Sequence, residues 1–365
     1  MESTVEIKLS RRKLRSIAND ASKSASAVDL VYVNDQQEGI LRIKKNGNHI
    51  YEMKGREVTD KELIARIKAL VIPPAWERVW ICKLANGHLQ ATGFDIKNRK
   101  QYIYHPTWNI LRNQTKYYHL YEFGKTLPTI REKLQHDIAR HDLPPEKILA
   151  TIVSLMQYTS IRIGSSAYEK LYGSIGLTTL KNKHVQIHGT KLQFSFIGKK
   201  GVHHDITVTS KRLAKILQQC KDIPGKELFQ YFDESGAKHA VDSGMVNNYI
   251  KEISGGNFTA KDFRTWAGTL HAIEAFKELG EATSEADAKR KINEALDIVA
   301  KQLGNTRSVC KKYYVHPAVI ELYSNNKLSK FFSNTQIANQ DSGLNVEEEI
   351  LMKILDGAKA SVITA

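Results

Sequence analysis

The sequence predicts an α+β fold, with a small β-rich N-terminal domain followed by a larger, mainly α-helical domain that contains a three-stranded β meander. Up to about residue 104, short runs alternate apolar and polar residues between turn-forming pairs, as half-buried strands do. Beyond that point the apolar residues recur at helical spacing. Alternation returns between residues 185 and 208, where Gly189 and the Gly198–Gly201 turn divide it into three strands.

The β-rich domain is expected to span residues 1–110. Asn46-Gly47 and Asn86-Gly87 are pairs that favour tight hairpin turns, so each predicts a turn beside a strand. One helix is expected over residues 60–70, because its apolar residues share a face and Pro73-Pro74 follows it.

The helical domain is expected to span residues 111–365. Helices often begin after a capping residue or at a proline and often end at a glycine, and these signals divide the domain. They predict helices from Pro145 to about Gly164, from Thr259 onwards through a capping box with Asp262, from Glu285 to Leu303 before Gly304, and from Val346 to Leu355 after a polar linker of residues 334–343.

The charge balance indicates a polyanionic partner. The chain has 54 Lys and Arg residues against 39 Asp and Glu, a formal net charge of +15. Basic residues gather around the predicted meander with Asp205 as the one acid among them, which suggests a phosphate track. Residues 1–28 are also basic without a regular apolar pattern, and predict either a frayed helix or a mobile basic arm. Nucleic acid is therefore the expected partner.

Cysteine usage and hydropathy indicate the compartment. Cys82, Cys220 and Cys310 are scattered and form no CxxC pair, which is typical of free thiols in a reducing environment. No apolar segment has the form of a secretory signal or the length of a membrane span. The sequence therefore predicts a cytoplasmic protein without membrane attachment.

Five polar residues of the second domain have distinctive neighbours. They are Arg162 in Ser160-Ile161-Arg162-Ile163-Gly164, Lys199 after Phe196-Ile197-Gly198, Arg264 in Lys261-Asp262-Phe263-Arg264-Thr265-Trp266, Asn305 after Leu303-Gly304, and Tyr314 after Lys311-Lys312-Tyr313. Each is ordinary alone, but chance seldom supplies all of these flanks in one order. The series resembles the type IB DNA topoisomerases, most closely the poxvirus-like enzymes of bacteria. The resemblance covers about residues 70–320 and implies the fold that these enzymes share with tyrosine recombinases.

The residue types suit attack on a DNA phosphodiester. That reaction needs a nucleophile, neutralisation of charge at phosphorus and a proton for the departing 5′ oxygen. A tyrosine hydroxyl is a weak nucleophile until cationic neighbours favour its ionised form, and the guanidiniums of Arg162 and Arg264 suit that task. The resemblance assigns the proton donor to Lys199 at the meander turn. We interpret Lys200 as a phosphate contact or a solvated charge.

At one position of the site this chain differs from some members of the family. Where the poxvirus and nuclear enzymes have His, this chain has Asn305, as the bacterial branch does. An amide can donate a hydrogen bond to a nonbridging oxygen but can neither carry a proton nor add charge.

Two adjacent tyrosines are candidates for the nucleophile. Tyr313 and Tyr314 would point about 100° apart on a helix, so only one can enter the site. The family's spacing from Gly304 selects Tyr314 and leaves Tyr313 as a packing residue.

In the first domain, Lys100-Gln101-Tyr102-Ile103-Tyr104 resembles the DNA-contacting strand of the family. The resemblance implies that Gln101, Tyr102 and Tyr104 contact DNA opposite the catalytic domain, so that a monomer clamps double-stranded DNA. Tyr102 and Tyr104 share a face of the strand. For Tyr104, half-buried packing within the strand is the alternative.

The resemblance implies a type IB topoisomerase that cleaves one strand through a 3′-phosphotyrosyl bond, allows rotation, and reseals the strand, relaxing positive and negative supercoils of nucleoid DNA. We expect no cofactor and no metal, because the chain lacks a GxxxxGK[ST] motif and His203-His204-Asp205 has no further spaced ligand. One alternative is a tyrosine recombinase, which usually has His at the position of Lys261. The other is a non-catalytic DNA-binding protein of the same fold.

Overall fold

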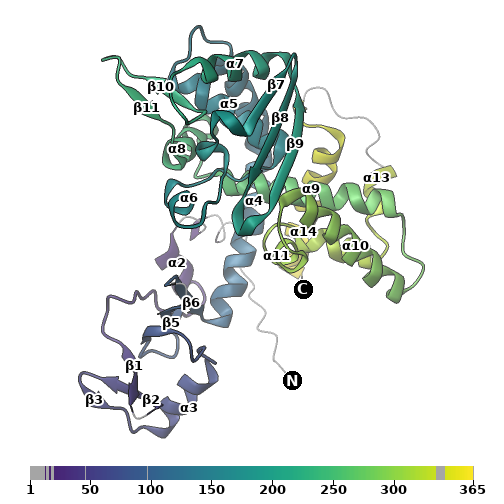
Figure 1. The fold of residues 1–365 in the computed structure, drawn as a ribbon. Coiled ribbons are helices and arrows are strands. Elements are labelled where there is room, and N and C mark those ends of the chain that lie inside the picture. Colours follow the sequence, from purple (N-terminus) through teal and green to yellow (C-terminus); the bar gives the residue numbers. More distant parts are fainter. Residues whose placement is uncertain are drawn as a thin grey trace. The chain divides into compact units, whose positions relative to one another are not determined.

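A computed structural model describes residues 13, 16–17, 20–45, 47–96, 98–333 and 342–364. The chain divides into two compact units inside helix α4 (Pro106–Ile138), between His119 and Leu120 (Figure 1). The boundary expected near residue 110 falls within the same helix. Asn46 of the predicted hairpin turn, residues 334–341 of the predicted linker and most of residues 1–19 lie outside the described residues.

An antiparallel six-stranded sheet forms the first unit, in the order β3-β2-β1-β4-β5-β6. Its strands are β1 (Ile40–Lys45), β2 (Asn48–Met53), β3 (Arg56–Glu57), β4 (Glu77–Ile81), β5 (Leu89–Phe94) and β6 (Lys100–Tyr104). The predicted helix is α3 (Lys61–Ala69), which begins after the capping residue Asp60. Its Ile67 is buried with Ile40 and Ile81 of the sheet. One face of the sheet is therefore covered by this helix.

The described part of the N-terminal segment includes a short packed helix. This helix, α2 (Ala21–Ser26), is capped by Asp20, whose side chain accepts a hydrogen bond from the Lys23 amide at 2.9 Å. Ala25 is buried with Ile17 and with Trp108 of α4. The described part of residues 1–28 thus includes a helix, as one of the two expectations had it.

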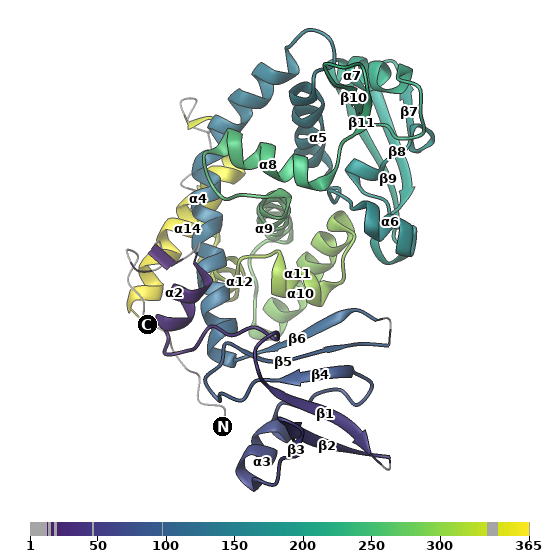
Figure 2. The same cartoon turned by 90° about the vertical axis from the view of Figure 1, so that its left-hand side faces the viewer.

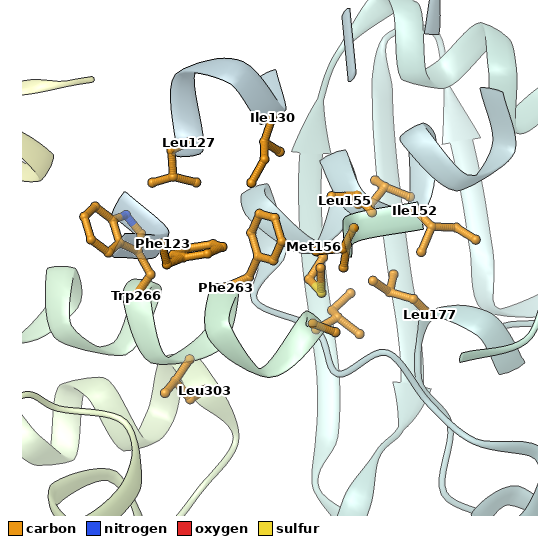
Figure 3. Close-up of a cluster of buried hydrophobic side chains, with 14 of the residues drawn as sticks. Phe123, Leu127, Ile130, Ile152, Leu155, Met156, Leu177, Phe263, Trp266 and Leu303 are labelled. Carbon is orange, nitrogen blue, oxygen red and sulfur yellow. The ribbon is translucent and has the colours of Figure 1, made fainter. Parts of the chain in front are cut away.

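The second unit is mainly helical and is built around one core. Its helices after α4 are α5 (Pro145–Thr159), α6 (Ser166–Tyr172), α7 (Lys211–Asp222), α8 (Ser243–Ser254), α9 (Ala260–Leu279), α10 (Glu285–Leu303), α11 (Arg307–Tyr313), α12 (Pro317–Ser324), α13 (Ser329–Ser333) and α14 (Val346–Thr364). Helix α9 packs against α5, α8, α10 and α12, and Figure 2 looks nearly along its axis. In the core, Phe123 of α4 lies edge-on to Phe263 and Trp266 of α9, with ring centroids 4.9 and 6.0 Å apart (Figure 3). Several neighbours therefore fix the helix that carries Arg264.

The predicted meander is present as β7 (Val185–His188), β8 (Lys191–Ile197) and β9 (His203–Thr209), paired antiparallel in chain order. Alternate residues of β8 are buried in the core of the second unit. The turn between β8 and β9 is a 3₁₀ turn, η3 (Lys199–Gly201). Two other 3₁₀ turns, η1 (Leu177–Thr179) and η2 (Asn182–His184), precede the meander, and a short hairpin of β10 (Gln230–Phe232) and β11 (Lys238–Ala240) follows it.

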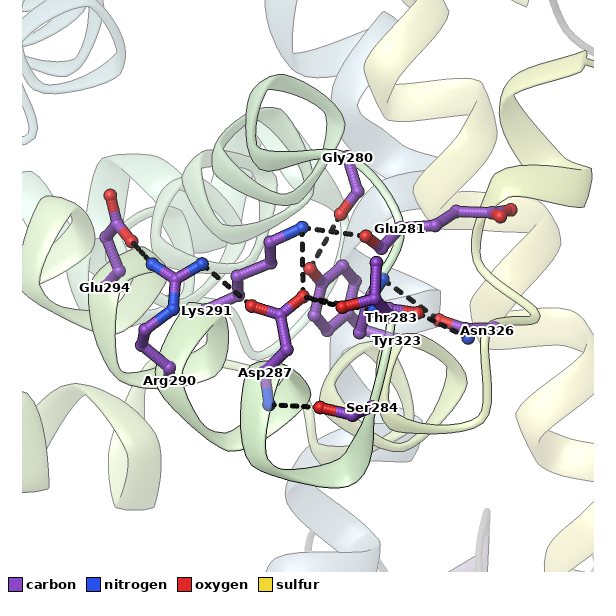
Figure 4. A network of polar contacts seen from close by, with 11 residues as sticks. Gly280, Glu281, Thr283, Ser284, Asp287, Arg290, Lys291, Glu294, Tyr323 and Asn326 are labelled. Atoms are coloured by element: carbon purple, nitrogen blue, oxygen red, sulfur yellow. Dashed lines mark hydrogen bonds and ion pairs between the residues drawn. The ribbon is translucent and has the colours of Figure 1, made fainter.

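A polar network fixes the connection between α9 and α10 (Figure 4). The Thr283 amide donates to the Asp287 carboxylate at 3.1 Å, and this hydrogen bond and the contact with Arg290 lower the pKa of Asp287. Tyr323 of α12 donates to the Gly280 carbonyl at 2.7 Å, just past the end of α9. Because α10 begins in this network, its far end at Leu303 is placed relative to α9.

The C-terminal helix α14 belongs to the second unit up to Ala360, and its apolar residues lie in the core of that unit. Glu348 is only 2% exposed. Its carboxylate accepts two hydrogen bonds from Arg131 of α4, at 2.6 and 2.9 Å, and one from Trp266 Nε1 of α9 at 3.2 Å. The helix predicted from Val346 is thus confirmed and extends beyond Leu355. The predicted α+β class is confirmed as well.

Candidate active site

Arg162 lies after the end of α5, in a segment that is neither helix nor strand. The helix was predicted to continue to about Gly164, and this prediction is wrong: α5 ends at Thr159, and Ser160 adopts a left-handed conformation with φ 53°. The next residues pair with η1, where the Leu177 amide donates to the Arg162 carbonyl at 2.9 Å and Thr178 to Ile163 at 2.7 Å. These contacts with a distant segment compete successfully with continuation of the helix.

The Arg162 guanidinium points to the turn that follows α10. Its Nη2 donates to the Gly304 carbonyl at 3.0 Å and to Asn305 Oδ1. Burial, and then repulsion from Arg264, lowers the pKa of Arg162 to about 10. The side chain therefore remains positively charged at neutral pH, and its direction is set by groups more than a hundred residues away in the chain.

Arg264 is the most buried member of the set, with 5% of its surface exposed. It lies in the first turns of α9, where the Thr259 amide donates to the Asp262 carboxylate at 2.8 Å, as in a capping box. Its guanidinium donates to the carbonyl of Ser160 and, at 2.9 Å, to the carbonyl of Leu303. Burial lowers the pKa of Arg264, and the neighbouring Tyr314 opposes this shift.

Tyr314 follows α11 directly and lies against Arg264. Its ring centroid is 5.3 Å from the guanidinium carbon of Arg264. Its backbone is fixed on both sides, because its amide donates to the Cys310 carbonyl at 2.9 Å and its carbonyl accepts from Thr269 Oγ1 at 3.1 Å. Gly268 permits this approach, since a Cβ there would lie 3.0 Å from the Tyr314 carbonyl oxygen. The structure thus brings Tyr314 to the arginines.

Asn305 has one side-chain group bound and one without a partner. Its Oδ1 accepts from Arg162, while its Nδ2 is buried and has no hydrogen-bond partner among the described residues. The residue follows Gly304, which ends α10 in a left-handed conformation with φ 59°. Since an unpaired buried donor is unfavourable, this amide N–H is suited to an acceptor that arrives with a ligand.

Lys199 completes a cavity of about 320 Å³ that Arg162, Arg264 and Tyr314 also line. The lysine lies in the exposed η3 turn, and its Nζ is 5.3 Å from the ring centroid of Tyr168 on α6. Four of the five predicted site residues thus share one cavity. Asn305 does not line it and is joined to it through Arg162.

The cavity is also lined by residues that the sequence does not mark as functional, among them Tyr168 and Lys261. Tyr168 lines it from α6, and Lys261 lines it one helical turn before Arg264. The spacing of three residues between Lys261 and Arg264 was visible in the sequence and places both on one face of a helix. No local pattern distinguished Tyr168 from the other exposed tyrosines.

The predicted DNA-contacting strand is β6, at the edge of the sheet in the first unit. Tyr102 is 48% exposed, and its ring stacks on Tyr104 with centroids 6.0 Å apart, so the two share a face as predicted. Tyr104 is half-buried and also lies 6.0 Å from the ring of His88. The Gln101 amide donates to Asp95 at 2.9 Å.

The polar residues around the meander turn differ in their surroundings. Lys200 is exposed and adopts a left-handed conformation with φ 64°. Lys181, part of the suggested phosphate track, forms an ion pair with Glu169 at 2.8 Å. His203 and His204 face opposite sides of β9, since His203 lies 3.4 Å from Ser195 Oγ and His204 stacks on Phe196. The described residues contain no group of three or more His, Cys, Asp or Glu side chains arranged as metal ligands.

Comparison with known proteins places the chain in a family. A family model described as the catalytic core of eukaryotic DNA topoisomerase I matches residues 99–341, and one described as the N-terminal domain of bacterial DNA topoisomerase IB matches residues 49–95. The first match covers more than half of the chain. The chain therefore belongs to the type IB DNA topoisomerase family, which confirms the resemblance seen in its sequence.

Individual relatives agree with this assignment. The chain is 33% identical over 300 residues to DNA topoisomerase 1B of Acanthamoeba polyphaga mimivirus, across 79% of this chain and 88% of the viral protein. It is 26% identical over 289 residues to DNA topoisomerase I of monkeypox virus and to DNA topoisomerase 1B of vaccinia virus (strain Copenhagen), across 78% of this chain and 85% of each relative. Among the described residues, no helix has both the length and the hydropathy needed to cross a membrane.

Proposed function

We propose that this member of the family relaxes supercoiled DNA by transient cleavage of one strand at the cavity of Arg162, Arg264, Lys199 and Tyr314. The Tyr314 hydroxyl oxygen attacks the phosphorus of a phosphodiester, and the bond from phosphorus to the 5′ oxygen breaks. A 3′-phosphotyrosyl bond then joins protein and DNA, and the free 5′ end rotates about the intact strand. Attack by the 5′ hydroxyl reverses the step, so the energy of the phosphodiester is conserved.

The two arginines stabilise the charge that develops on the nonbridging oxygens in this mechanism. Their carbonyl partners hold both guanidiniums in place, so little reorganisation accompanies the reaction. The unpaired Asn305 Nδ2 donates to a nonbridging oxygen in the same way, without adding charge. The convergence of the two arginines with Tyr314 at one cavity is the observation that carries the proposal.

Lys199 is the proton donor for the departing 5′ oxygen in this proposal. It is the one lysine of the meander turn that lines the cavity, whereas its neighbour Lys200 does not. We assign Lys200 to a contact with a DNA phosphate. The exposed η3 turn leaves Lys199 free to approach a bound strand.

The first unit supplies the second half of a clamp around double-stranded DNA. Its exposed Tyr102, on an edge strand beside Gln101 and Tyr104, offers aromatic and amide groups to the duplex. The protein acts as a monomer in the cytoplasm, on nucleoid DNA.

A plasmid assay without divalent metal or nucleotide tests this function. In EDTA, the protein should relax negatively and positively supercoiled plasmid alike, because in the proposed chemistry the two arginines stabilise the phosphate charge and Lys199 supplies the proton. Agarose gels resolve the products as a ladder of topoisomers. A tyrosine recombinase would instead require two specific sites and give rearranged products. A DNA-binding protein without catalysis would give neither topoisomers nor a covalent adduct.

Removing the Lys199 ammonium should slow cleavage, and a better leaving group on the DNA should restore the cleavage rate. Lys199→Ala is expected to lower the single-turnover cleavage rate by about 10²-fold on ordinary DNA, because the 5′ oxygen leaves without a proton. On DNA with sulfur at the 5′ bridging position, which leaves unprotonated, the variant should approach the wild-type rate. Arg264→Ala is the comparison, because it acts on nonbridging oxygens and should stay slow on both substrates. A Lys199→Ala deficit that persists with sulfur would contradict the acid role.

A further inference from the structure

His204 occupies the space between two turns that carry site residues. A Cβ placed on Gly198 would lie 2.7 Å from His204 Nε2, and a Cβ on Gly304 would lie 2.8 Å from His204 Cε1. Gly198 directly precedes Lys199, and Gly304 directly precedes Asn305. The imidazole therefore packs against the backbone of a glycine on both sides. A larger residue at either position would occupy part of the space that the ring fills.

The ring is held in this space by the meander. His204 stacks on the buried Phe196 of β8, with ring centroids 4.9 Å apart and an interplanar angle of 21°. The neighbouring His203 projects from the opposite face of β9 and lies beside Ser195. The position of the His204 ring is thus determined by the strand pair and not by the loop that carries Lys199.

Charge also favours a neutral ring here. Burial, and then the positive charges of Arg162 and Arg264, lower the pKa of His204. At neutral pH the imidazole therefore fills the space without adding a third cation beside the two guanidiniums. On the side of Gly304 it supports the residue whose carbonyl accepts the hydrogen bond from Arg162.

We propose that His204 is a positioning residue for strand cleavage, whose ring acts as a spacer between the Lys199 turn and the Gly304–Asn305 turn. On one side it sets the place of the ammonium that protonates the 5′ oxygen. On the other side it sets the place of the Gly304 carbonyl and the Asn305 side chain, which orient Arg162. The Asn305 amide also contacts the phosphate in the proposed function. The inference rests on the proposed function of Lys199. It adds the residue that positions Lys199 relative to the other groups of the site.

His204→Ala tests the spacer. On ordinary DNA, single-turnover cleavage at saturating duplex should fall by on the order of 10² fold, since a small displacement of catalytic groups has effects of that size. On DNA with sulfur at the 5′ bridging position, the loss of cleavage rate should be several times smaller. Sulfur leaves without a proton, so a displaced Lys199 no longer slows the reaction. A general loss of structure would slow both substrates equally. His203→Ala, on the opposite face of β9, is the matched control and should cleave both substrates at nearly the wild-type rate.

Gly198→Ala disturbs the same contact from the other side. Gly198 has φ −91°, so alanine is tolerated by the backbone, but its methyl group would displace the imidazole. Gly198→Ala should slow cleavage alone and have much less effect in the His204→Ala background, because the displaced ring is already gone. Thermal unfolding of each variant verifies that it is folded, and the double variant gives a second measurement if His204→Ala is unstable.

The outcomes separate this inference from the proposed function. If Lys199→Ala is rescued by sulfur and His204→Ala is not, the spacer role is wrong while the acid role of Lys199 stands. If Lys199→Ala is not rescued, the acid role fails and the spacer inference fails with it. Additive effects of Gly198→Ala and His204→Ala would also overturn the spacer, since they would show that the two residues act independently.

Discussion

Replacing Tyr314 by Phe should abolish the covalent protein–DNA adduct and plasmid relaxation, with cleavage at least about 10⁴-fold slower than in the wild type. The substitution removes only the hydroxyl that we propose as the nucleophile. The packing of the ring and the backbone contacts to Cys310 and Thr269 do not use this hydroxyl. The variant should therefore fold normally and still bind duplex DNA. Trapping with detergent, followed by a denaturing gel, measures the adduct.

Tyr313→Phe is the matched control for this prediction. Tyr313 is the adjacent residue, is 43% exposed, and does not line the cavity. Its variant should form the adduct and relax plasmid at close to the wild-type rate. An adduct formed by Tyr314→Phe, or one lost only in Tyr313→Phe, would show that the nucleophile has been assigned to the wrong residue.

Replacing Arg264 by Ala should affect both catalysis and stability. Cleavage is expected to slow by about 10³-fold, because a fixed cation facing the nonbridging oxygens is lost. The free energy of unfolding should fall by about 1–3 kcal/mol, since the carbonyls of Ser160 and Leu303 lose their buried donor. Single-turnover kinetics and denaturant titration measure the two effects separately.

Arg264→Lys separates charge from geometry at this position. A lysine keeps the positive charge but lacks the planar fork that reaches two carbonyls at once, so the cleavage rate should remain far below the wild-type rate. Arg290→Ala is the control, because this arginine is exposed on α10 and pairs with Asp287 and Glu294. It should change stability by less than about 1 kcal/mol and leave cleavage intact. A fully active Arg264→Lys variant would refute the geometric argument.

Much of the fold could be predicted because its signals are local. The meander follows from alternation along β8, and the end of α10 follows from a glycine that adopts a left-handed conformation at Gly304. The start of α9 follows from the reciprocal pairing of Thr259 and Asp262. Each of these features involves residues only a few positions apart, so the pattern along the chain contains the required information.

The failures involve contacts between distant segments. The end of α5 could not be predicted, because residues 162 and 163 leave the helix to pair with residues 177 and 178. The five candidate site residues are recognisable from their order and flanks, but Tyr168 lines the cavity from a short helix without a distinctive pattern. The His204 ring fits between two glycines more than a hundred residues apart, a relation that no local pattern expresses.

The carbonyls that bind Arg264 come from the C-terminal ends of two helices, one from Ser160 just past α5 and one from Leu303, the last residue of α10. The C-terminal end of a helix has partial negative charge from its unpaired carbonyls, and a buried cation there neutralises it. The Arg264 guanidinium and the helix ends therefore stabilise each other. Fraying of the final turn of α10 would remove one of the two carbonyls that hold the guanidinium while the rest of the unit stayed folded, so inactivation on heating should precede global unfolding.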